Sequence, residues 1–419
     1  MQGCRLRRNF RRLGWRGAVC AVAAAGLFPI SAATAHAGVP DPIRGGCPGL
    51  VVLGVQGTSE SSPTADAFTD SGMLAHVFVP MLATGVSIER AYVPYPASFG
   101  GAPLTGSGVT PFADSVAAGR VNLDQMAASA ATQCPHSDLA VAGFSGGAAV
   151  VSSFAEAVGS GYGPVSADRI AGVALISNPV RRAGSGSVPG RAGQIAPSPA
   201  PGTSGAAVGQ IRLGPVPASG GIADTGIDFG ALSGRVAEFC LPGDLACDAP
   251  GNAAALHLAA AIAAQADLRD PIAALNSLLG VLTTTLGQAR STIILEDFQI
   301  HGGQVNYVPA RSASQRIAAA ADPRVPDPGP QDIHAAAVKE GQIVAAITGD
   351  PFGQLPRVLG QLGAAIAQNF ADNAGLLDPA VLGRYINLVA SHAGYATGGQ
   401  TQQVADWFAA LSHDLGGNP

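Results

Sequence analysis

The stretch that decides the fold is residues 139–158, LAVAGFSGGAAVVSSFAEAV. It opens with a short apolar run typical of a strand, turns at Gly143-Phe144-Ser145-Gly146-Gly147, and continues as a small-residue amphipathic helix. The turn in such a G-x-S-x-G motif is so sharp that side chains two positions before and after the serine would collide. This geometry exposes the serine hydroxyl and directs the free N–H groups of the helix start toward a developing negative charge.

Glycine is abundant in this chain, with 56 glycines in 419 residues. A chance G-x-S-x-G is therefore expected about once, and the flanking strand and helix carry the interpretation. Further strand candidates are residues 50–55, 86–92, 169–177 and 236–240, with helical patterns at 69–84 and 114–132. This alternation predicts an α/β fold, a three-layer sandwich with a central, mostly parallel sheet and helices on both faces.

Residues 252–388 have a different character, because long Ala/Leu-rich helical stretches dominate at 271–289, 331–348 and 355–373. Only residues 292–300 look strand-like there. We interpret 252–388 as an α-helical insertion or lid that covers the site and offers a channel for long acyl chains; a separate helical domain is the alternative. The predicted core is then residues 38–251, completed by 389–419 with a final helix at 401–415.

The first 37 residues have the pattern of an export signal. Six arginines precede an apolar run at 18–30, and Ala35-His36-Ala37 is a cleavage signal of the A-x-A type. Arg7-Arg8 also loosely resembles a twin-arginine signal. We expect a secreted or envelope protein, in which no later stretch is long and apolar enough to span a bilayer. Without the six arginines the charge becomes 17 − 28 = −11, which argues against nucleic acid as a partner.

Four cysteines remain after removal of this leader, an even number in an exported chain, so two disulfides are expected. Four cysteines allow three pairings, of which we favour Cys47–Cys134 and Cys240–Cys247. The second pair would close a small loop around Asp244. A metal site is the alternative, but the chain has no C-x-x-C or H-x-x-x-H spacing, so we expect no metal.

A serine hydroxyl needs a histidine to take its proton and a carboxylate to orient that histidine. Asp244 fits the acid, because it follows the strand at 236–240 and lies in a turn between two cysteines. A turn-forming aspartate is the alternative. The strand, G-x-S-x-G turn and helix at residues 139–158 resemble the nucleophile turn of α/β-hydrolases, in which the order along the chain is serine, acid, histidine.

The chain resembles the cutinase family of serine esterases in four motifs that occur in the right order. These motifs are Gly57-Thr58-Ser59-Glu60, Tyr95-Pro96-Ala97, the Ser145 turn with Ala148, and the cysteine-bracketed loop 240–247. The resemblance covers roughly residues 47–250 and a short C-terminal piece. It implies Ser145 as nucleophile, Asp244 as acid, and an oxyanion hole made by Thr58 and the Gly146 N–H. Glutamine is common in the family at the position of Gly146.

The histidine is the least specified member of this set. His392-Ala393-Gly394-Tyr395 has the family's H-x-x-Y pattern and lies before the final helix. His257 has the short spacing after the acid that compact members show, but it lies inside a helical run. His392 is the preferred base, His257 the alternative catalytic base, and His301 a third candidate.

The resemblance implies an exported serine esterase that needs no cofactor and acts on lipid-like or polyester substrates. A phospholipase, a thioesterase or an acetyl-carbohydrate esterase would use the same residues, as would an acyltransferase. The alternative of another class is a non-catalytic binding protein of the cell envelope on a hydrolase scaffold. Peripheral association with envelope lipids fits either interpretation.

Overall fold

A computed structural model describes residues 39–103, 105–223, 226–322 and 325–416. The leader expected at residues 1–37 lies outside these ranges. The central element is a five-stranded sheet in the order β2-β1-β3-β4-β5, and every neighbouring pair is parallel. The strands are β1 (Leu50–Val55), β2 (Ile88–Tyr92), β3 (Asp138–Phe144), β4 (Ile170–Ile176) and β5 (Val236–Phe239).

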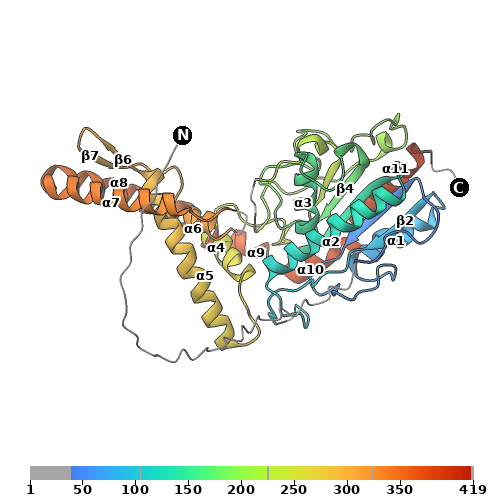
Figure 1. The fold of residues 1–419 in the computed structure, drawn as a ribbon, viewed down its shortest axis with the longest axis horizontal. Coiled ribbons are helices and arrows are strands. Elements are labelled where there is room, and N and C mark those ends of the chain that lie inside the picture. Colours follow the sequence, from blue (N-terminus) through green and yellow to red (C-terminus); the bar gives the residue numbers. More distant parts are fainter. Residues whose placement is uncertain (1–38, 104, 224–225, 323–324, 417–419) are drawn as a thin grey trace, which may run out of the picture. The chain divides into compact units, whose positions relative to one another are not determined.

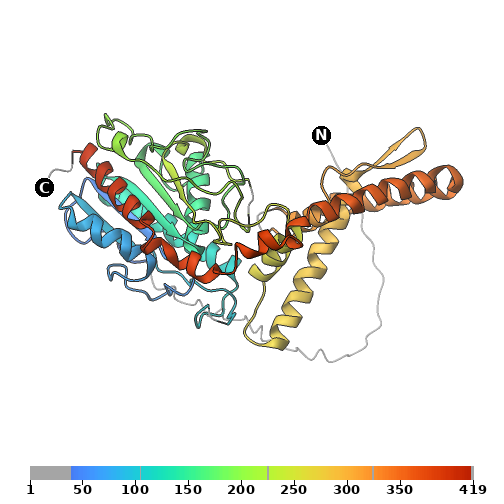
Figure 2. The same ribbon diagram turned by 180° about the vertical axis from the view of Figure 1, so that it is seen from behind.

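Helices cover both faces of this sheet, as Figure 1 shows. The helices α2 (Phe112–Gln133) and α3 (Gly146–Gly159) pack on one face, and α1 (Gly72–Ala83) and α11 (Gln400–Asp414) pack on the other. Figure 2 shows α11, in red, along its face of the sheet. The predicted α/β sandwich is confirmed, and the strand and helix ends differ from the expected ones by a few residues.

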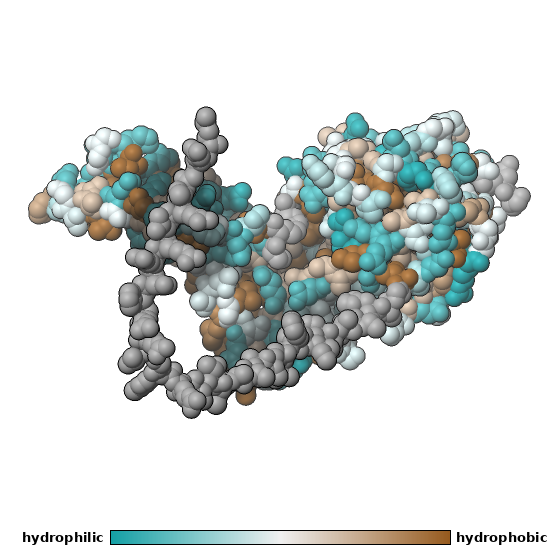
Figure 3. Space-filling model, viewed as in Figure 1, coloured by the Kyte–Doolittle hydropathy of each residue, from teal (hydrophilic) through white to brown (hydrophobic). Residues whose placement is uncertain are grey.

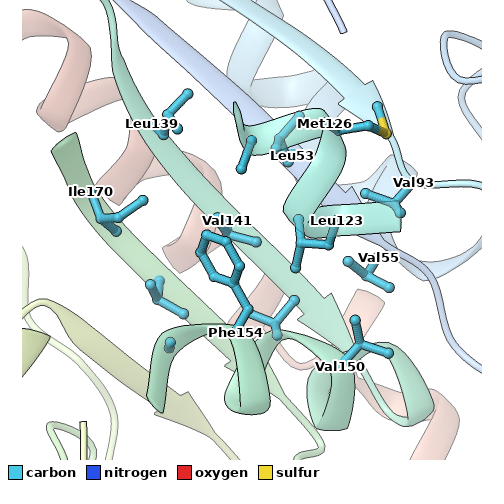
Figure 4. Packing of buried hydrophobic residues seen from close by; sticks show 14 of the residues in the cluster. Leu53, Val55, Val93, Leu123, Met126, Leu139, Val141, Val150, Phe154 and Ile170 are labelled. Atoms are coloured by element: carbon cyan, nitrogen blue, oxygen red, sulfur yellow. The ribbon is translucent and has the colours of Figure 1, made fainter. Parts of the chain in front are cut away.

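Apart from the edge strand β2, the strands are buried on both faces because their side chains alternate between two apolar clusters. In β1, Val51, Leu53 and Val55 point to the side of α2 and α3, and Leu50 and Val52 point to the side of α1 and α11. Figure 4 shows the first cluster, in which side chains from strands and helices interdigitate. This rigid core holds the carboxyl ends of the strands in place.

Two disulfides join the expected cysteines. Cys47 is bonded to Cys134, so the lead-in to β1 is joined to the end of α2. Cys240 is bonded to Cys247, which closes the short loop after β5. The second bond therefore restrains the loop that contains Asp244.

The segment after the β5 loop is built mainly of helices, with a small apolar cluster of its own. This cluster joins Ile294, Val305, Ala336, Ile343 and Val358. Its elements are α4 (Ala254–Ala264), α5 (Pro271–Thr292), β6 (Phe298–His301), β7 (Gln304–Tyr307), α6 (Ala313–Ala320), α7 (Pro330–Gly349) and α8 (Pro351–Ala371). Two short helices, α9 (Pro379–Gly383) and α10 (Leu388–Ala393), lead back to α11.

The expectation of one strand at residues 292–300 was wrong in part. Helix α5 runs to Thr292 and a five-residue π turn follows, so that the strand β6 begins only at Phe298. Strand β6 pairs with β7 in an antiparallel hairpin that the sequence analysis did not identify. The two glycines of the turn, Gly302 and Gly303, both have positive φ angles, which explains the tight connection.

The described residues include one stretch, Pro271–Asp297, that meets a length and hydropathy criterion for crossing a membrane. Its best 18-residue window has a mean hydropathy of 1.2, and 11% of that window is buried. Length and composition alone are weak evidence, because core helices meet the same criterion. No clear transmembrane segment follows from it.

Candidate active site

Ser145 lies between β3 and α3, on the sharp turn that the sequence predicts. Its φ angle is 53° and its ψ angle −119°, a strained conformation for a residue with a side chain. A Cβ at Gly143 would lie 2.6 Å from the carbonyl oxygen of Gly147. A Cβ at Gly147 would overlap the carbonyl oxygen of Val55 at the end of β1. Both glycines are therefore needed for this turn and for its close approach to β1.

The loop after β1 brings Thr58 beside the start of α3. A Cβ added to Gly146 would lie 3.0 Å from Thr58 Oγ1 and 3.7 Å from Thr58 N. The Glu60 carboxylate holds this loop, since it accepts hydrogen bonds of 3.0 Å from the N–H groups of Gly57 and Met73. Burial raises the pKa of Glu60, and these two hydrogen bonds oppose the rise. Thr58 and Gly146 are thus neighbours, as an oxyanion hole requires.

Asp244 lies in the disulfide-closed loop after β5 and is fully buried. Its carboxylate accepts hydrogen bonds from His392 Nδ1 (2.9 Å), Tyr395 Oη (2.6 Å) and the Ala246 N–H (3.1 Å). Burial alone would raise the pKa of Asp244, but hydrogen bonds from His392, Ser177 and Tyr395 outweigh burial and lower it. Asp244 is therefore ionised at neutral pH, the state that can orient a histidine.

His392 lies near the end of α10, and 34% of its side chain is exposed. Its ring packs beside that of Phe144, the residue before Ser145, with 5.2 Å between the ring centroids. Because Nδ1 donates to Asp244, Nε2 is left as the unprotonated nitrogen of the neutral imidazole. The structure thus brings the preferred histidine, the acid and the end of β3 together.

The two alternative histidines have other surroundings. In α4, His257 Nδ1 faces the carbonyl oxygen of Ile222 at 2.7 Å, and Nε2 faces that of Pro250 at 3.2 Å. Both nitrogens of His257 therefore contact backbone carbonyls. His301 is the last residue of β6, in the hairpin of the helical segment. His392 is the one of these three histidines that bonds to Asp244.

Two site residues have roles that the sequence analysis did not assign. Ser177 directly follows β4, is fully buried, and its hydroxyl lies 3.1 Å from His392 Nδ1. Tyr395, the last residue of the H-x-x-Y pattern, is also fully buried, and besides its bond to Asp244 it accepts one from the Leu241 N–H (3.1 Å). The pattern itself could have indicated Tyr395, whereas no motif marks Ser177.

A metal-binding arrangement is not found among the residues that the structure describes, which contain no group of three His, Cys, Asp or Glu side chains suited to hold an ion. The chemistry available at the site is that of a serine, a histidine and a carboxylate beside backbone N–H groups.

The parallel sheet, the strained serine turn and the acid and histidine at the strand ends define an α/β-hydrolase. Comparison with known proteins then gives the family. The sequence model of the cutinase family matches residues 46–268, more than half of the chain, so the chain belongs to the cutinase family.

A curated relative is 27% identical over 225 residues, which span 49% of this chain and 67% of the relative. It is described as a carboxylesterase Culp6 homolog from Corynebacterium glutamicum. Family membership and this relative identify the chain as a carboxylic ester hydrolase.

Solved structures with some similarity include the catalytic core domain of an acetyl xylan esterase from Trichoderma reesei. It shares 17% identity, with a TM-score of 0.36, over 56% of this chain and 99% of the other. A cutinase-like protein from Cryptococcus sp. shares 20% identity, with a TM-score of 0.29, over 48% of this chain and 80% of the other.

Proposed function

We propose that this esterase works through a catalytic triad of Ser145, His392 and Asp244, with Thr58 and Gly146 as the oxyanion hole. One observation carries the proposal: the 2.9 Å hydrogen bond between His392 Nδ1 and Asp244 Oδ1, which joins residues 148 positions apart beside the Ser145 turn. The low pKa of Asp244 supports its role, because an ionised carboxylate stabilises the imidazolium that forms during the reaction.

The reaction then follows from proton transfers at named atoms. Ser145 Oγ attacks the ester carbonyl carbon and gives its proton to His392 Nε2, and the carbonyl π electrons move to the oxygen. The Gly146 N–H and Thr58 stabilise that oxyanion. Collapse of the tetrahedral intermediate breaks the ester bond, and the alcohol leaves with the proton from His392. Water repeats the sequence on the acyl-enzyme, releases the acid and restores Ser145.

The substrates that we propose are lipid-like or polyester esters. Large apolar side chains exposed on the helical segment, where Figure 3 shows hydrophobic residues at the surface, favour apolar substrates over sugars. The two disulfides fit an exported protein, in agreement with the leader expected at residues 1–37. We therefore place the enzyme outside the cytoplasm, secreted or in the cell envelope.

We further propose that residues 252–388 form an insertion between the acid and the base of one hydrolase core. This division is supported by the residues that follow the helical segment, because Tyr395 and side chains of α11 belong to the apolar cluster of the sheet. The apolar cluster of the helical segment is made of its own residues. A lid function for the insertion stays a prediction.

The test is hydrolysis of p-nitrophenyl esters of increasing chain length by the purified chain. Ser145→Ala and His392→Ala should each lower kcat by a factor of about 10³ or more, and His257→Ala should leave it near the parent value. Faster hydrolysis of long-chain than of acetyl esters supports the substrate class. Equal activity of the parent and Ser145→Ala contradicts the mechanism.

A further inference from the structure

The motif Tyr95-Pro96-Ala97 lies beside the active site, and no step of the proposed reaction uses it. It follows β2, which is the neighbour of β1 in the sheet. Beyond the paired strands, the Val93 N–H donates to the Gly54 carbonyl oxygen at 2.8 Å, so the chain after β2 continues alongside the end of β1. The motif therefore runs beside the loop that contains Thr58.

Two hydrogen bonds join the motif to the chain on either side of Thr58. Tyr95 Oη donates to the Gln56 carbonyl oxygen at 2.6 Å. The Ser59 N–H donates to the Ala97 carbonyl oxygen at 2.7 Å. Because Gln56 lies two residues before Thr58 and Ser59 directly follows it, the motif holds the backbone of Thr58 from both directions.

Backbone strain accompanies the second of these bonds. The φ angles of Ser59 and Ala97 are 68° and 47°, in the left-handed region that favours glycine. Among the residues that the structure describes, the other residues besides glycine with a positive φ angle are Ser145 and Ser177. Both of these belong to the active site, where strained residues are known to cluster. The strain at Ser59 and Ala97 therefore indicates that their bond serves the same site.

Tyr95 is tightly packed, and its hydroxyl remains a hydrogen-bond donor. The residue is 1% exposed. A Cβ added to Gly119 in α2 would lie 2.8 Å from Tyr95 Cδ2, so this glycine makes room for the ring although glycine is unfavourable inside a helix. Burial and the negative charge of Glu60 both raise the pKa of Tyr95, so that the hydroxyl keeps its proton.

Thr58 is held without the use of its own donors. Within the described ranges, neither the N–H nor the hydroxyl of Thr58 makes a hydrogen bond to the protein. The residues around it are attached instead, through contacts with Glu60, Tyr95 and Ala97. Both donors of Thr58 thus stay available beside the Gly146 N–H. Donors that are fixed before the reaction stabilise an oxyanion without a cost of reorganisation.

We propose that Tyr95 is a positioning residue that, together with the Ala97 carbonyl, fixes Thr58 in the oxyanion hole. The inference rests on the proposed assignment of Thr58 and Gly146 to that hole and adds what holds Thr58 in place. Because Tyr95 is buried, it acts through the Gln56 carbonyl and not on the substrate. The oxyanion forms only as the reaction proceeds, so a displaced donor should affect kcat more than KM.

The test compares Tyr95→Phe with Tyr92→Phe in the hydrolysis of p-nitrophenyl butyrate. Tyr95→Phe should lower kcat about ten-fold with KM near the parent value, a smaller effect than the roughly 10²–10³-fold loss when a donor is removed outright. Tyr92 is the matched control, because it is 3% exposed and its hydroxyl donates to Asp70 Oδ1 at 3.0 Å. Asp70 keeps its hydrogen bonds from Arg90, so Tyr92→Phe should keep the parent kcat.

Inhibition by a trifluoromethyl ketone gives a second readout, because its adduct with Ser145 carries an oxyanion as the transition state does. The inhibition constant should rise in Tyr95→Phe by about the factor by which kcat/KM falls, and it should stay at the parent value in Tyr92→Phe. A hydroxyl that only stabilises the fold would lower the melting temperature of both variants and leave kcat and the inhibition constant unchanged. That result would overturn the proposal.

The remaining outcomes separate this proposal from the proposed catalysis. Melting temperatures above the assay temperature show that both tyrosine variants are folded. Tyr95 loses the assigned role if Tyr95→Phe changes KM alone, or if Tyr92→Phe lowers kcat as much. If Ser145→Ala is inactive while Tyr95→Phe matches the parent, the triad stands and the role of Tyr95 is refuted. If Ser145→Ala is as active as the parent, both proposals fail.

Discussion

Ser177→Ala tests whether the acid and the histidine depend on a third partner. The Ser177 hydroxyl lies 3.1 Å from His392 Nδ1 and contributes to the low pKa of Asp244. The φ angle of Ser177 is 54°, in the left-handed region, where a residue other than glycine costs about 1–2 kcal/mol. A serine at this position gives up stability that glycine would keep, which points to a use for its hydroxyl.

The expected magnitude follows from the hydrogen bond. A hydrogen bond to a charged group, here the ionised Asp244, contributes about 1.5–3 kcal/mol. Each 1.4 kcal/mol corresponds to about a factor of ten in rate. Ser177→Ala should therefore lower kcat about 10- to 100-fold. KM should change little, because Ser177 contacts His392 and Asp244 and acts as a positioning residue.

Ser177→Gly is the matched control, because it removes the same hydroxyl and relieves the backbone strain. It should be more stable than Ser177→Ala by about 1 kcal/mol in urea unfolding, with the same loss of kcat on p-nitrophenyl butyrate. Activity that recovers together with stability in the glycine variant would assign Ser177 a structural role. Parent-like kcat in Ser177→Ala would refute the reasoning.

Three other substitutions test the core and the helical segment. Burial raises the pKa of Glu238 to about 8, so the free energy of unfolding should fall by about 1.4 kcal/mol per pH unit as pH rises from about 4.5 to 8. Glu238→Gln should remove this dependence of the unfolding free energy on pH in urea unfolding. A dependence that persists in the variant contradicts its assignment to Glu238. Gly147→Ala should lower the free energy of unfolding by more than about 3 kcal/mol, because the added Cβ would overlap the Val55 carbonyl oxygen. A melting temperature like that of the parent would be inconsistent with the tight turn. Arg316→Met leaves the fully buried Asp297 without its ion-pair partner and should destabilise the helical segment by about 3–5 kcal/mol, seen as faster hydrogen exchange there; unchanged exchange argues against it.

The sheet could be predicted from the sequence because β1, β3 and β4 are nearly continuous apolar runs and Ser145 is bracketed by the glycines that its turn requires. The two disulfides join the cysteines that we paired from the sequence, and His392, which bonds to Asp244, belongs to the H-x-x-Y pattern. These signals are local, or they occur in a fixed order along the chain.

Other features depend on contacts that local patterns do not encode. Helix α8 is oriented in part by Gln354 and Gln361, which accept hydrogen bonds from N–H groups of β7, about 50 residues earlier. Ser177 gains its neighbours only when β4 is placed beside the loop of Asp244. The hairpin β6–β7 had a visible signal, because two glycines separate two short runs, but the surrounding helical pattern concealed it.

The central claim is that Ser145 is the nucleophile and that His392 activates it. Its most direct test is labelling of the purified chain with a fluorophosphonate, followed by mass spectrometry of the peptides. We expect one label on Ser145 in the parent and in His257→Ala, and little or none in His392→Ala. Labelling of another residue, or equal labelling in His392→Ala and the parent, would contradict the claim.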